Sequence, residues 1–126
     1  MLNALESMPK ASAVSRPTIG IDLVSVARFR ALLKPRQRHL LAKIFTQDEI
    51  AYGKRYRDSA PHLAGMFAAK EAASKALGTG RAPYLALEVR HRADGAPEIW
   101  QGKKRAPVAI SITHERAAAA AVAIAI

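Results

Sequence analysis

The sequence predicts an α+β fold, because one strand-like apolar run is followed by helical segments and then by alternating segments typical of hairpins. The chain has 126 residues, which is the usual size of one domain. Half of its residues are apolar and 24% are charged, an ordinary globular composition. We therefore expect a single domain over residues 18–126. Residues 1–17 mix Ser, Ala and Pro without periodicity, and we expect them to form a flexible tail.

The first half of this domain begins with a strand and continues in short helices. The run TIGIDLV at 18–24 is rich in β-branched residues and predicts a buried strand. Ser25 is placed to cap a helix that Pro35 ends. Thr46 and Glu49 have the spacing of a capping box, in which each side chain accepts a hydrogen bond from the other residue's backbone amide. The expected helices cover residues 25–33, 37–45 and 46–56.

The second half contains the longest helix and the hairpins. The segment HLAGMFAAKEAASKAL follows Pro61 and ends at Gly78, which suits the left-handed residue after a helix. In the last segment bulky Val and Ile residues alternate with alanines, so one face of that strand is bulky and the other nearly flat. The expected strands cover residues 85–89, 97–100, 108–113 and 117–126.

Composition excludes several classes of protein. Cys is absent, so disulfides, thiolate metal sites and a cysteine nucleophile are ruled out. The longest apolar run, residues 117–126, is too short to span a bilayer, and the N-terminus lacks the pattern of a secretory signal. We therefore expect a cytosolic protein that does not enter a membrane.

The positive charge is concentrated in one stretch of the chain. Lys and Arg number 20 against 10 Asp and Glu, and residues 28–57 hold nine of these basic residues against two acidic ones. Such a field attracts an anionic partner: nucleic acid, an anionic membrane, an acidic protein or a phosphate-rich small molecule. The few aromatic residues are scattered and form no stacking platform, so a basic nucleic-acid-binding module without catalysis stays an unspecific alternative.

Two carboxylates are candidates for a metal site. Asp22 interrupts the apolar strand, and Glu71 lies in the long helix, which must bury one face. Taken singly, Asp22 is expected more often to be an N-cap or a satisfied half-buried carboxylate, and Glu71 to form a surface pair with Lys75. Taken together, two carboxylates that meet at the edge of a core repel each other unless a cation lies between them. Two carboxylates with phosphate oxygens and water are the usual ligands of Mg²⁺.

Other polar residues are candidates for phosphate binding. Lys70 and Lys75 flank Glu71 and would bind phosphate beside the metal, although for Lys70 a side chain that extends from an apolar helix toward solvent is the favoured interpretation. Ser111 lies near a strand end on the same face as Thr113, and His114 follows in the turn, where an exposed structural role is the simpler interpretation.

The ordered motifs of the chain resemble those of a known family. The segments are GIDLVSVAR at 20–28, IFTQDE at 44–49, LAGMFAAKEAASKALGTG at 63–80 and ISITH at 110–114. They are similar to the motifs of holo-[acyl-carrier-protein] synthases, the short single-domain group of 4′-phosphopantetheinyl transferases. The likeness covers roughly residues 18–126. Thr113 stands where this family usually has Ser, and Arg81 where an apolar residue is common.

The resemblance implies a fold and a reaction. The family's fold places one long helix on an antiparallel sheet, and its members form homotrimers with active sites between subunits. They transfer the 4′-phosphopantetheine arm of coenzyme A to a serine of an acidic apo acyl carrier protein, with Mg²⁺, and release adenosine 3′,5′-bisphosphate. Neither the class of carrier protein nor the general base, Glu71 or a metal-bound water, follows from the sequence.

The resemblance also implies roles for particular residues. The family's metal-binding acids match Asp22 and Glu71, and its catalytic lysine matches Lys75. Its carrier-facing arginine matches Arg28, with Arg30 on the same helix. For coenzyme A we expect contacts from four residues, some of them reaching the site of an adjacent subunit: Lys70, Lys75, Ser111 and His114.

Overall fold

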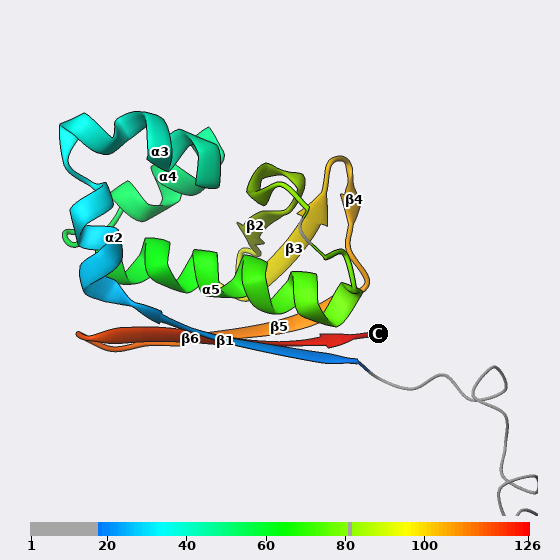
Figure 1. The fold of residues 1–126 in the computed structure, drawn as a ribbon. Helices are drawn as coiled ribbons and strands as arrows, with labels where there is room; N and C mark the ends of the chain where they lie inside the picture. The colour runs from blue at the N-terminus through cyan, green and yellow to red at the C-terminus, as the bar shows by residue number, and fades with distance from the viewer. Residues whose placement is uncertain (1–17, 81) are drawn as a thin grey trace, which may run out of the picture.

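A long central helix, α5 (Ala60–Leu77), lies across one sheet and beneath the remaining elements (Figure 1). The computed structural model describes residues 18–80 and 82–126. The first sheet has the strand order β1-β6-β5 and the second has the order β2-β3-β4, and every strand pair is antiparallel. The expected α+β fold, with one long helix packed on an antiparallel sheet, is therefore confirmed.

The elements of the first half are one strand and a run of short helices. Figure 1 shows α2, α3 and α4 gathered on the side of α5 away from the first sheet. Their bounds are β1 Ile19–Ser25, α2 Val26–Leu32, α3 Arg38–Ile44 and α4 Gln47–Lys54, with a 3₁₀ turn at Pro35–Gln37.

The second half contains the hairpins. The bounds are β2 Glu88–His91, β3 Pro97–Gln101, β4 Lys104–Arg105, β5 Val108–His114 and β6 Ala118–Ala125, with a 3₁₀ turn at Tyr84–Ala86. The strand expected over 85–89 therefore starts three residues late. The 3₁₀ turn that follows Pro83 takes up its first residues, and it leaves Leu85 exposed while Leu87 and Val89 are buried.

The flat face of β6 is the one that packs on α5. Three alanines of β6, Ala119, Ala121 and Ala123, are buried, whereas Ile124 between them and the chain end is exposed. α5 in turn presents buried alanines to the sheet, so small side chains on both elements allow close approach. The bulky face of β6 is left on the outer side of the sheet.

Local capping follows the sequence closely. Thr46 Oγ1 accepts from the Glu49 amide, and Glu49 Oε1 accepts from the Thr46 amide, so the capping box that starts α4 is confirmed. Gly78 ends α5 in the left-handed conformation, with φ of 68°. Ser25 precedes α2 as expected but makes no side-chain capping bond. The expected tail over 1–17 and the departure at Arg81 lie outside the described residues.

Candidate active site between the strand β1 and the helix α5

Asp22 and Glu71 approach each other where β1 crosses α5. Alternation along β1 leaves Ile21 and Leu23 exposed and turns Asp22 toward the helix, where its side chain keeps 19% of its surface. Burial raises the pKa of Glu71 above its ordinary value, and the charge of Asp22 raises it further. Lys75, one helical turn after Glu71, lies 3.7 Å from Asp22 Oδ1, so the structure places the two acids that the sequence singles out near each other at the contact of β1 and α5, where their charges repel.

Cations surround this pair of acids. Lys75 Nζ donates a hydrogen bond of 2.8 Å to the carbonyl oxygen of Ile21 and lies 3.7 Å from Asp22 Oδ1. Burial nevertheless raises the pKa of Asp22, and the charge of Lys75 opposes that rise without cancelling it. The charge of Arg28 on α2 also opposes the rise in the pKa of both acids, so Arg28 lies near the same site. Two acids and two cations thus form one cluster from three elements.

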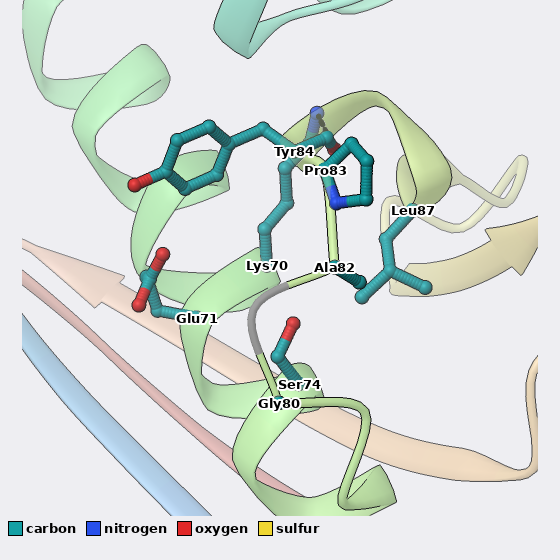
Figure 2. A pocket seen from close by; sticks show the side chains of 8 residues that line it. All are labelled: Lys70, Glu71, Ser74, Gly80, Ala82, Pro83, Tyr84 and Leu87. Carbon is teal, nitrogen blue, oxygen red and sulfur yellow. Dashed lines mark hydrogen bonds between the residues drawn. The ribbon is translucent and has the colours of Figure 1, made fainter.

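A pocket opens beside Glu71, along the same turns of α5. It has a volume of about 450 Å³, and the residues that line it come from α5 and from the segment that leads into β2 (Figure 2). They are Lys70, Glu71, Ser74, Gly80, Ala82, Pro83, Tyr84 and Leu87. A shallower hollow of about 440 Å³ continues past Lys75 to Gly78. The cavity is of the size that receives part of an extended ligand.

Lys70 is placed differently from the sequence expectation. Its side chain is buried, and Nζ lies 2.6 Å from Glu49 Oε1 and donates to the carbonyl oxygens of Ile44 and Tyr84. The three protons of the ammonium group are thereby used within the protein. The expectation that Lys70 binds a cofactor phosphate is corrected: its charge is directed to protein oxygens and is not offered to a ligand.

Ser111 and His114 do not join the acids within one chain. Ser111 and Ile21 pair with the same residue of β6, Val122, so Ser111 lies with Ile21 on the outer face of the sheet, opposite Asp22. His114 packs against His62, with ring centroids 4.8 Å apart, near the start of α5. A role for either residue beside Glu71 would require a second copy of the chain.

A cluster of aromatic and histidine rings around His114 was missed by the sequence reasoning. Tyr56 stacks on His62 with ring centroids 3.5 Å apart, and Tyr52 stacks on His91 with ring centroids 3.8 Å apart. These rings line a cavity of about 190 Å³. The four-residue spacing of Tyr52 and Tyr56 is the signal that could have indicated a shared helix face, but the histidines come from elements distant in the sequence.

The basic residues expected to dock a carrier protein differ in their surroundings. Arg30 makes two hydrogen bonds to the carboxylate of Asp58, at 2.8 and 2.9 Å, and both side chains are about half exposed. Arg28 has no such fixed acid partner among the described residues, and its guanidinium lies 5.9 Å from the Phe67 ring. Of the two, Arg28 therefore presents the charge that is less compensated.

Comparison with known proteins identifies the family. A model of the 4′-phosphopantetheinyl transferase superfamily matches residues 18–126. The chain belongs to this superfamily. It is 37% identical over 99 residues to a holo-[acyl-carrier-protein] synthase of Thermodesulfovibrio yellowstonii, covering 78% of this chain and 88% of the relative. It is 40% identical over 111 residues to the synthase of Chlorobaculum parvum, covering 84% and 95%.

Solved structures from the same family share the fold. The holo-[acyl-carrier-protein] synthase of Helicobacter pylori in complex with coenzyme A matches with a TM-score of 0.74 and 31% identity, over 86% of this chain and 99% of that chain. The synthase of Bacillus anthracis, in complex with CoA (3′,5′-ADP), matches with a TM-score of 0.73 and 32% identity, over 86% and 94%. Among the described residues of our chain, no helix is both long and apolar enough to cross a membrane.

Proposed function

We propose that this chain is a holo-[acyl-carrier-protein] synthase that transfers 4′-phosphopantetheine from coenzyme A to a serine of an apo acyl carrier protein. Membership of the family supports the reaction, since the matched relatives carry this name. The observation that carries the proposal is the meeting of Asp22 and Glu71, with Lys75 beside them, next to a pocket. This is the arrangement that transfer from a diphosphate requires.

The two acids fit a divalent cation, for which we propose Mg²⁺. Burial raises the pKa of each, and the charge of Asp22 raises that of Glu71 further, which is the electrostatic condition that a bound cation relieves. Among the described residues no group of three or more acids and histidines could hold a metal ion. Asp22 and Glu71 would thus supply two ligands and leave the others to phosphate and water, as Mg²⁺ prefers. When bound, the ion would neutralise the diphosphate and orient it.

The chain's own residues would support the transfer in two ways. The serine oxygen of the carrier forms a bond to the β-phosphorus of coenzyme A, while the bond to the bridging oxygen breaks and adenosine 3′,5′-bisphosphate leaves. Lys75, more than half exposed at the mouth of the site, would stabilise the charge on the leaving phosphate. Glu71, whose pKa is raised by burial, is suited to accept the serine proton.

We propose that a homotrimer completes the site. The outer face of the first sheet exposes Ile19, Ile21 and Leu23 of β1, each with about 70% of its surface free, and Ile124 of β6. An exposed apolar face that includes three neighbouring side chains of one strand favours contact with another copy of the chain. In such an assembly Ser111, which lies on that face, and His114, which lies at the end of β5 on the opposite face, would reach the coenzyme A bound by a neighbouring subunit.

The acidic carrier protein would dock beside Arg28. The charge of this residue opposes the rise in the pKa of Asp22 and of Glu71. The basic stretch over 28–57 extends from it along α2, α3 and α4. Long-range attraction of this kind acts mainly on the rate of encounter and weakens with salt. We further propose that the reaction takes place in the cytosol, where coenzyme A and carrier proteins meet.

Mass spectrometry of an apo carrier protein tests this function directly. After incubation with coenzyme A, Mg²⁺ and the full chain, we expect one serine to gain the mass of a phosphopantetheine group. Glu71→Gln, shown to be folded by circular dichroism, serves as the matched control and should give no product. Absence of product with the wild-type chain and apo fatty-acid, polyketide and peptide carriers, in Mg²⁺ or Mn²⁺, would contradict the proposal.

A further inference from the structure

A buried ion pair holds the turn of α5 that carries Glu71. Lys70 directly precedes Glu71 in α5, so the two side chains leave the helix about 100° apart around its axis. The side chain of Lys70 enters the core. Lys70 is 2% exposed and Glu49 is 1% exposed, and Nζ lies 2.6 Å from Oε1. Removing two charges from water offsets most of their attraction, so stability alone is a weak reason for such a pair.

The pair joins four segments to that turn of the helix. Lys70 Nζ donates to the carbonyl oxygen of Ile44, at the end of α3, and to that of Tyr84, at 2.7 and 3.2 Å. Glu49 accepts from the amides of Thr46 and Val89, each at 2.8 Å. Every donor of Lys70 and both oxygens of Glu49 are therefore engaged, which fixes the geometry of the pair.

One of these segments is a wall of the pocket beside Glu71. Ala82, Pro83 and Tyr84 face Glu71 and Ser74 across a cavity of about 450 Å³ (Figure 2). The Tyr84 ring packs on the Phe67 ring with centroids 5.2 Å apart, yet Tyr84 is 42% exposed. The hydrogen bond from Lys70 ties the backbone of this exposed turn to α5, and it does so one residue from Glu71.

We propose that Lys70 is a positioning residue: together with Glu49 it sets the spacing between Glu71 and the turn at Tyr84, and thereby the width of the pocket that receives coenzyme A. The inference rests on the proposed function, since it assigns the pocket to that substrate. It predicts that Lys70 acts on coenzyme A binding and not on the carrier protein, which would dock beside Arg28.

The test uses the double variant Glu49→Gln/Lys70→Met in the full chain. Changing both residues avoids leaving one charge buried without a partner, and Met matches the unbranched shape of Lys. We expect the KM for coenzyme A, and its Kd by calorimetry without carrier protein, to rise about ten-fold or more, equivalent to about 1.4 kcal/mol. The KM for carrier protein should stay within about two-fold. Hydrogen exchange at the Ala86 amide, which closes the Tyr84 turn on the Pro83 carbonyl, should accelerate.

Leu63→Val is the matched control. Leu63 is 1% exposed on α5, two turns before Lys70, so its truncation weakens the core without touching the pair. Its KM for coenzyme A should not change. The inference is overturned if the folded double variant binds coenzyme A like the wild type, if both KM values rise together, or if Leu63→Val shows the same rise. If the wild-type chain neither binds coenzyme A nor modifies carrier protein, the proposed function fails, and unchanged exchange at Ala86 would separately overturn the role of Lys70 in holding the turn.

Discussion

Gly20 determines how closely β1 approaches α5, and therefore how closely Asp22 approaches Glu71. A Cβ atom at this position would lie 2.0 Å from the carbonyl oxygen of Ala72 and 2.9 Å from Cβ of Lys75, where ordinary contacts begin at 3.4 Å. The oxygen belongs to the helix backbone, so rotation of a side chain cannot relieve the clash. Gly20→Ala must move the strand and the helix apart by about 1 Å or more, a displacement large enough to impair catalysis.

We expect two effects of Gly20→Ala. The free energy of unfolding should fall by about 1–3 kcal/mol, as in other overpacked cores. The kcat should fall by about 100-fold, because a misplacement of about 1 Å at reacting groups has roughly this effect. The assay measures initial rates with both substrates saturating, at a temperature well below the midpoint of thermal unfolding.

Gly102→Ala provides a control of matched chemistry. Gly102 has φ of 60° in the turn between β3 and β4, and an added Cβ would meet nothing within 4 Å. The substitution should destabilise the fold by about 1 kcal/mol through backbone strain while leaving Asp22 and Glu71 in place. Wild-type kcat in Gly20→Ala, or an equal loss in Gly102→Ala, would refute the idea that close approach of β1 to α5 builds the site.

Three further predictions concern charge. Asp22→Asn and Glu71→Gln should each lower kcat by at least about 100-fold. The thermal unfolding midpoint near pH 7 should stay the same or rise, because the raised pKa of each acid means that the fold favours its neutral form. A large loss of stability would contradict this. Burial lowers the pKa of His62 and His91, so stability should be full above about pH 6.5 and fall as the pH drops, and thermal melts of His62→Gln/His91→Gln should show a flatter acid limb. Arg28→Glu should raise the KM for carrier protein about ten-fold or more in low salt and that for coenzyme A much less; equal rises would remove its docking role.

The sequence predicts the elements well where the signal is local. The capping box at Thr46 and Glu49 and the left-handed Gly78 depend on residues that are neighbours in the chain, and both are confirmed. The strand expected at 85–89 starts three residues late, because a 3₁₀ turn follows Pro83 and the alternation of Leu85 and Leu87 does not reveal it. The alternation in β6 does not indicate which of its two faces is buried. That depends on its packing partner, because the alanine face is buried by contact with α5.

The site was predicted in part for the same reason. Asp22 and Glu71 stand out as polar residues within apolar elements, and the topology does bring them together. The role of Lys70 was mistaken because its three oxygen partners come from residues 44, 49 and 84, and no pattern near Lys70 indicates them. The ring cluster around His114 likewise depends on contacts between α4, α5 and β2 that arise only in the folded chain.

The account depends most on whether one divalent ion is shared by the strand acid and the helix acid. A crystal structure of the chain with coenzyme A and Mn²⁺, recorded at the manganese absorption edge, measures this directly. We predict a single anomalous peak within about 2.2 Å of a carboxylate oxygen of Asp22 and of Glu71. A peak that contacts neither acid, or only one of them, in every subunit would contradict the account.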